Sequence, residues 1–238
     1  MKRNWLLGRP FFRHILFSGT AAGFVCGLLS CSGVPTTGSG TGVGNGMIVG
    51  QVMYANGTHP KNAAVRLRLQ NFLPDTSGKL LTARTSTVAN VVTDSDGTFQ
   101  IDQLDPQQKY TIEVNDGKTK TEATLFKCDL SLKDTVVFEP RALEPVVPIS
   151  GEITLSGLPR NSYILIYGLE RVGRSDAQGR FTITDLPVGE CEENECEYEM
   201  RAIVPNADGT TTTIPYELEI ERDMNGNVKL PIELEISD

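Results

Sequence analysis

The fold is decided by the stretch TDSDGTFQI, which covers Thr93–Ile101. An aspartate at the start of a turn accepts hydrogen bonds from backbone amides two residues further on, and a glycine adopts a positive φ at low cost. Asp94 and Gly97 therefore predict a turn. Phe99 and Ile101 alternate with polar residues, so we expect a strand after the turn, with Phe99 entering the interior of a β-sandwich.

A second copy of this stretch, RSDAQGRFTI, covers Arg174–Ile183. A constant offset of 82 positions relates the two copies. It maps Asp94, Gly97, Phe99, Ile101 and Leu104 onto Asp176, Gly179, Phe181, Ile183 and Leu186. Upstream, Gly50 and Gly151 correspond at an offset of 101, and downstream Tyr110 and Tyr198 at an offset of 88. The repeat therefore predicts two domains with the same fold, each with this turn and a phenylalanine in its core.

The composition favours strands over helices. Of the 238 residues only 7% are aromatic, and short runs of Thr, Val, Ile and Leu are interrupted by Gly, Pro, Asn and Asp. We expect an all-β protein with two tandem antiparallel β-sandwiches of the prealbumin-like or immunoglobulin-like kind. Their expected bounds are 47–139 and 149–238, with a Pro-rich linker at 140–148.

Short alternating runs mark the expected strands. Ala64–Leu69 and Tyr110–Val114 alternate apolar and polar residues, as half-buried strands do. The other strands are expected at Met47–Tyr54, Thr85–Thr93, Ala123–Phe126, Thr135–Phe138, Ile149–Leu155, Tyr163–Tyr167, Tyr198–Val204, Thr211–Ile220 and Val228–Ile236.

The repeated pattern resembles the carboxypeptidase regulatory-like domain, a prealbumin-like β-sandwich. The matching residues are Gly50–Val52, Ala64–Leu67, Thr93–Leu104 and, in the second domain, Pro187–Gly189. The first domain departs from the family at Pro106–Gln108, where a Pro-x-Gly is usual. The resemblance implies the fold and little about function, because such modules are accessory parts of many proteins.

Residues 1–30 are predicted to be a signal peptide. Four basic residues precede an apolar run at Ile15–Leu29, which is short beside the roughly 20 residues of a membrane span. A transmembrane anchor is the alternative. The run ends in Leu28-Leu29-Ser30-Cys31, which resembles the bacterial lipobox, and Cys26 is a poorer match. This resemblance implies that Cys31 becomes the first mature residue and carries the lipid.

The implied location is the cell envelope, with the protein attached to the membrane through its N-terminal lipid. Ser32 follows the lipidated cysteine, which in a Gram-negative cell implies the outer membrane. Residues 31–46 are rich in Gly, Ser and Thr and are expected to form a flexible tether. Loss of the four basic residues of the signal peptide would change the formal charge from −8 to −12, so we expect no binding of nucleic acid. Simple solubility is the alternative explanation of this charge.

The cysteines predict one local disulfide, between Cys191 and Cys196. Cys128 then remains as a buried free thiol, a partner for another chain, or a competitor for the local pair. We expect no cofactor, metal or catalytic residue. His59 is the only histidine of the mature chain, and no nucleophile motif accompanies it. Asp94 and Asp96 could open a calcium loop, but Phe99 stands where that loop needs glycine, and Gln178 replaces the second aspartate in the other copy.

These features predict a non-enzymatic, lipid-anchored envelope protein that is a structural, adhesive or protein-binding module. The alternative is a polysaccharide-binding accessory lipoprotein of an uptake or degradation system. The expected partner is therefore an envelope protein or a glycan. Sugar binding needs exposed aromatic faces. The candidates for it are Tyr54, Tyr163, Tyr167 and Tyr216.

Overall fold

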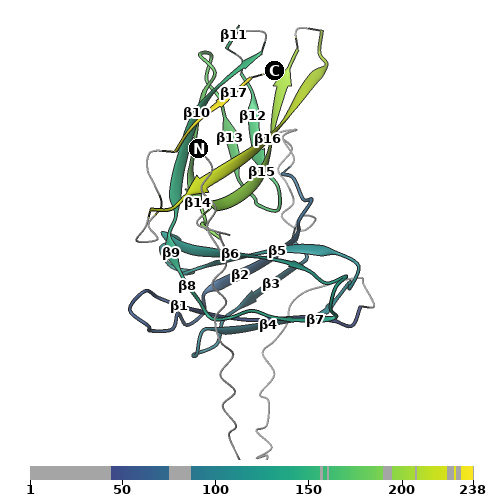
Figure 1. Cartoon of the computed structure of the whole chain (residues 1–238), viewed down its shortest axis with the longest axis vertical. Coiled ribbons are helices and arrows are strands. Elements are labelled where there is room, and N and C mark those ends of the chain that lie inside the picture. Colours follow the sequence, from purple (N-terminus) through teal and green to yellow (C-terminus); the bar gives the residue numbers. More distant parts are fainter. Residues whose placement is uncertain are drawn as a thin grey trace, which may run out of the picture. The chain divides into compact units, whose positions relative to one another are not determined.

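The structure, a computed structural model, describes residues 44–74, 87–155, 158–159, 161–189, 195–206, 208–223, 228 and 232–237 (Figure 1). All described residues belong to one unit of the chain. These residues form strands and turns, which confirms the all-β fold class. Among them, no helix is long and apolar enough to cross a membrane.

The first sandwich consists of two sheets. One has the strand order β4-β1-β7, with β8 also beside β1, and the other has the order β3-β2-β5-β6-β9. Its strands are β1 (Gly46–Met53), β2 (Ala64–Leu69), β3 (Ala89–Val92), β4 (Thr98–Leu104), β5 (Lys109–Asn115), β6 (Glu122–Asp129), β7 (Thr135–Val137), β8 (Arg141–Ala142) and β9 (Glu144–Pro145).

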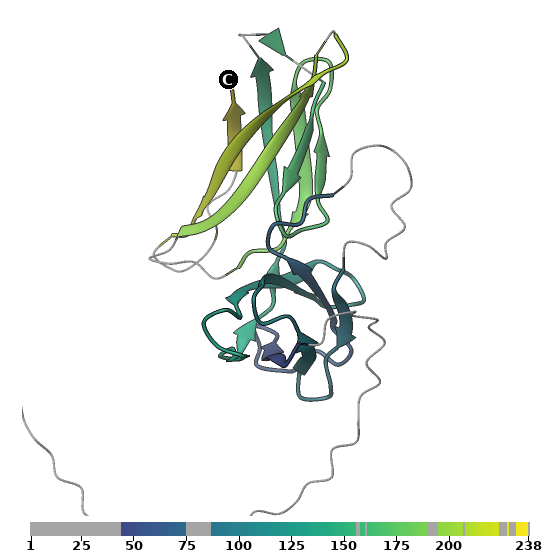
Figure 2. The same ribbon diagram turned by 90° about the vertical axis from the view of Figure 1, so that its right-hand side faces the viewer.

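The second sandwich repeats this plan (Figure 2). One sheet has the order β11-β10-β14, with β17 beside β10, and the other has the order β13-β12-β15-β16. The strands are β10 (Val147–Leu155), β11 (Leu158–Pro159), β12 (Tyr163–Ile166), β13 (Val172–Arg174), β14 (Arg180–Leu186), β15 (Glu195–Pro205), β16 (Thr211–Glu221) and β17 (Ile232–Ile236).

The register of the strands confirms the equivalences that the spacing predicts. Gly50 of β1 pairs with Phe99 of β4, and Gly151 of β10 pairs with Phe181 of β14. The same irregularity interrupts both ladders, between Gly46 and Ile48 in one and between Val147 and Ile149 in the other. Both sandwiches therefore share this detail of strand pairing as well as the turn.

We expected purely antiparallel sheets, but each sandwich also contains parallel strand pairs. β1 pairs in parallel with β7 and β8, and β10 pairs in parallel with β17. A parallel neighbour needs a long crossover. Here most of each sandwich lies between the two paired strands in the chain. Residues 140–148, the expected linker, contain β8 and β9, which pair with β1 and β6.

Each sandwich has its own hydrophobic core, and a phenylalanine lies against a glycine in both. Phe99 is 2% exposed and Phe181 is 4% exposed. A Cβ atom on Gly50 would lie 2.4 Å from the ring of Phe99, and one on Gly151 would lie 3.0 Å from the ring of Phe181. The glycines therefore provide the space that the rings occupy.

A buried ion-pair cluster joins the outer face of one sheet of the first sandwich to the second sandwich. Arg68 of β2 and Glu113 of β5 are 0% and 1% exposed, and Nη1 of Arg68 lies 3.4 Å from Oε2 of Glu113. Arg171, which directly precedes β13, contacts Oε1 of Glu113 at 2.7 Å. Glu170 contacts Arg68 at 2.7 Å, and Asp185 contacts Arg171 at 3.1 Å. Each charge in the cluster thus has a partner of opposite sign.

Backbone contacts reinforce this junction. The N–H of Gly168 donates to the carbonyl oxygen of Phe72 at 2.8 Å. Gly189 forms a parallel bridge with Leu125 of β6, and Leu125 packs into the core of the second sandwich. The ammonium of Lys127 donates to the carbonyl oxygen of Glu197 at 2.8 Å. The outer face of the β2-β5-β6 sheet is therefore covered by protein at these positions.

Truncating either phenylalanine, by Phe99→Ala or Phe181→Ala, should lower the free energy of unfolding by about 3–5 kcal/mol, because the ring leaves a cavity over a glycine. Urea denaturation of the single variants measures this. An unchanged unfolding midpoint in both variants would contradict the core assignment.

The substitution Glu113→Ala should cost up to about 3–5 kcal/mol of stability, because it removes the buried partner that Arg68 and Arg171 share. Among the described residues, Arg68 then keeps only Glu170 as an ion-pair partner, which is 35% exposed, and Arg171 keeps only Asp185, which is 52% exposed. The matched control is Arg180→Ala, which removes an exposed pair with Asp176 (67% and 44% exposed). That loss should be about 0–1 kcal/mol. Equal unfolding free energies for the two variants would exclude a structural role for the cluster.

Candidate functional site

The repeated aspartates serve their own turns. Oδ1 of Asp94 accepts hydrogen bonds from the N–H groups of Asp96 and Thr98, both at 2.9 Å. Oδ1 of Asp176 accepts from the N–H groups of Gln178 and Arg180 at the same distance. The amide of Arg180 is the main cause of a lowered pKa for Asp176. Gly97 and Gly179 have φ values of 71° and 80°, which glycine adopts without strain.

The residue before each aspartate also takes part, a role that the sequence pattern did not predict. The Thr93 hydroxyl donates to the carbonyl oxygen of Pro60 at 2.6 Å and accepts from the N–H of Ala63 at 3.0 Å. The hydroxyl of Ser175 accepts from the N–H of Ser162 at 2.6 Å. Both hydroxyl residues are buried and related by the repeat offset of 82 positions, which could have revealed them. Each motif therefore also connects its turn to the segment that precedes the next sheet's strand, β2 in the first sandwich and β12 in the second.

The described residues give little support for metal or histidine chemistry. No group of three His, Cys, Asp or Glu side chains among them could hold a metal ion. His59 is exposed, and its Nδ1 lies 3.3 Å from the carbonyl oxygen of Val52. The ring lies beside the first turn of the repeat, since a Cβ atom on Gly97 would lie 3.2 Å from the same nitrogen.

The cysteines are only partly covered by the structure. Cys128 is a half-buried free thiol, and burial raises its pKa to about 11. Cys196 is buried and disulfide-bonded. Its predicted partner Cys191 and the predicted lipidation site Cys31 lie outside the described residues, so both assignments stay predictions.

The four candidate tyrosines fall into two groups. Tyr54 and Tyr216 pack against the cores of the first and second sandwich. Tyr163 and Tyr167 alternate along the chain with Ile164 and Ile166, which belong to the core. They therefore lie on the opposite face of the sheet β13-β12-β15-β16, which we call the outer sheet face.

One end of the outer sheet face is aromatic, apolar and basic. The guanidinium of Arg174 lies 6.0 Å from the ring centre of Tyr163, and that of Arg201 lies 5.2 Å from the ring centre of Tyr167. The register places Leu165 between Val172 and Arg201. Leu165 is 1% exposed but belongs to neither core.

The other end of the outer sheet face is acidic. Glu199 is paired in register with Glu217, and Glu197 with Glu219, along β15 and β16. All four are exposed. The alternating glutamates of both strands are visible in the sequence, but their register as facing pairs is not.

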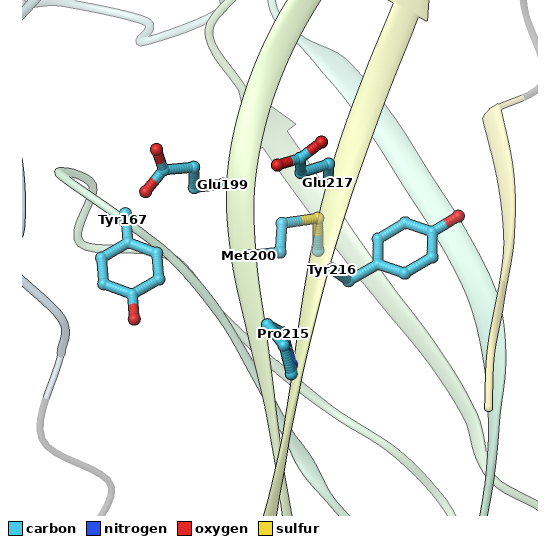
Figure 3. Close-up of a pocket in the computed structure, with 6 residues that line it drawn as sticks. All are labelled: Tyr167, Glu199, Met200, Pro215, Tyr216 and Glu217. Atoms are coloured by element: carbon cyan, nitrogen blue, oxygen red, sulfur yellow. The ribbon is translucent and has the colours of Figure 1, made fainter. Parts of the chain in front are cut away.

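A hollow of about 480 Å³ lies where the two ends meet. It is lined by Tyr167, Glu199, Met200, Pro215, Tyr216 and Glu217. Figure 3 shows Tyr167 and Tyr216 extending to opposite sides of the strand pair. The hollow therefore combines one outer-face aromatic ring with two facing carboxylates.

Comparisons with known proteins identify no family. No family model and no curated protein matches this chain. Among solved structures, the TIE protein of Bacillus anthracis is 16% identical with a TM-score of 0.28, over 82% of this chain and 33% of that one. A streptococcal ancillary pilin is 13% identical with a TM-score of 0.34, over 81% of this chain and 62% of that one.

The major pilin subunit BcpA of Bacillus cereus is 16% identical with a TM-score of 0.26, over 74% of this chain and 59% of that one. The chain thus spans between about a third and somewhat under two thirds of the length of these three proteins. TM-scores this low support no inference about the function of this chain.

Proposed function

We propose that this chain is a non-enzymatic, lipid-anchored protein of the cell envelope that acts as a structural or adhesive module and binds a protein partner through the outer sheet face. The observation that carries the proposal is this exposed face, where apolar, aromatic and charged side chains meet beside a hollow. Exposed apolar side chains rimmed by polar ones mark many interaction sites.

The junction between the sandwiches supports a structural role. The buried cluster of Arg68, Glu113 and Arg171 joins β2 and β5 to the start of β13. A module that carries a binding face benefits from such a fixed support, because a rigid surface loses less conformational entropy on binding. The lipid on Cys31 and the tether at 31–46 would attach this module to the membrane, which for a Gram-negative cell would be the outer membrane.

Polysaccharide binding is the second candidate function, and the position of Tyr163 and Tyr167 on the outer sheet face favours it. A sugar would stack on an exposed ring. Arg174 and Arg201 already lie over these rings, so a sugar would have to displace a guanidinium. A protein partner can instead use the arginines directly, and for this reason we prefer it.

Lipid anchoring predicts that Cys31→Ser moves the protein from the membrane fraction to the soluble envelope fraction, since the acyl chains supply the membrane affinity. Cys26→Ser, which changes the poorer lipobox match, should leave the protein in the membrane fraction. Immunoblots of fractionated cells measure this. Membrane retention of the Cys31→Ser protein would contradict the lipid anchor.

The binding proposal predicts that beads coated with the protein adhere to isolated envelopes and that Val172→Asp weakens adhesion. Val172 is 44% exposed on the outer sheet face, whereas Val137 of the first sandwich is 70% exposed elsewhere. Val137→Asp is therefore the matched control and should adhere normally. A glycan array should give no signal. A glycan signal that is lost in Tyr167→Ala would overturn the proposal in favour of polysaccharide binding.

A further inference from the structure

We propose that the acidic end of the outer sheet face, at β16, docks an extended polypeptide segment with lysine or arginine at alternate positions. The inference rests on the proposed function and names the chemistry of the partner. It is carried by three features: a sheet edge, a set of facing carboxylates, and the hollow beside them.

The first feature is the edge. β16 (Thr211–Glu221) ends the strand order of its sheet and is paired along its length with β15. Within the described parts of the chain, no further strand extends this sheet beyond β16. An edge strand presents backbone N–H and C=O groups to which an extended segment can pair. Pro215 lacks an N–H group, so the pairing would centre on Glu217 and Glu219.

The second feature is the charge. Like charges directly opposite each other on a sheet are unfavourable. The two facing pairs, Glu199–Glu217 and Glu197–Glu219, nevertheless occupy neighbouring positions. Among the residues that the structure describes, none of these four carboxylates forms an ion pair. The nearby ammonium of Lys127 donates to the backbone carbonyl of Glu197, and its charge offsets part of the negative charge of Glu197 and Glu199 without an ion pair to either.

The third feature is the hollow. Its aromatic wall, Tyr167, already accepts a guanidinium, that of Arg201, 5.2 Å from its ring centre. Glu199 and Glu217 line the same hollow. A lysine or arginine side chain from a partner would therefore find two carboxylates for its charged end, and its apolar stem could pack beside the Tyr167 ring.

The same features disfavour a second copy of this chain as the occupant. Two β16 edges placed together would bring two rows of glutamates into one sheet, and like charge opposes that pairing. Pro215 also interrupts it. A basic segment relieves the repulsion that is present in the free protein, so the edge selects partners by charge.

The test uses the purified full chain in detergent and a fluorescent peptide of alternating lysine and threonine that is as long as β16, 11 residues. Fluorescence anisotropy should show binding that weakens as salt is added. A peptide of alternating glutamate and threonine should not bind. No binding of the lysine peptide at low salt would overturn the inference.

The variant E199Q/E217Q should bind the lysine peptide about tenfold more weakly, as expected for the loss of two exposed ion pairs. The matched control is E152Q/E235Q, which removes another register pair of glutamates, between β10 and β17. It should bind like the wild type. Equal weakening in both variants would mean attraction to the net charge alone and would overturn the site.

This outcome is distinguishable from a failure of the proposed function. If E199Q/E217Q binds the lysine peptide normally while Val172→Asp still reduces adhesion to envelopes, the inference fails and the proposed function stands. If adhesion is absent in the wild type, the proposed function fails whatever the peptide does.

Discussion

The buried ion pairs of Glu113 are the interaction on which the arrangement of both sandwiches depends. Moving a charge from water into protein costs several kcal/mol, and only a close partner of opposite sign offsets that cost. Arg68, on the same sheet as Glu113, supplies one partner, and Arg171 from the second sandwich supplies the other. Glu113, on the outer face of the β2-β5-β6 sheet, therefore has both of its arginine partners only when the second sandwich is in place.

The local parts of the fold follow from the sequence because their causes are local. Asp94 and Gly97 bond and bend within their own turn, and the same holds for Asp176 and Gly179. Most expected strands form within a few residues of their predicted bounds. The parallel pairing of β7 with β1 and of β17 with β10 was missed. Each pair joins the first and last parts of a sandwich, and no local sequence pattern marks it.

The burial of Arg68, Thr111 and Glu113 was missed for a different reason. Their strands alternate apolar and polar residues, which predicts one face toward a core and the other toward water. The structure covers the polar face with a second domain. Alternation cannot distinguish these cases. The candidate site shows the same limit, since Tyr163 and Tyr167 were among four tyrosines and only the register separates them from Tyr54 and Tyr216.

The parallel ladder between β10 and β17 has a mechanical consequence. Ile149–Ile153 runs beside Ile232–Ile236 in the same direction. A pulling force applied between Val147 and Ile236 would act along both strands in opposite senses. The inter-strand hydrogen bonds would then be loaded in shear and together, whereas a hairpin pulled from its open end separates one bond after another. Under tension applied between these two residues, this strand order would therefore resist separation where β17 closes the second sandwich.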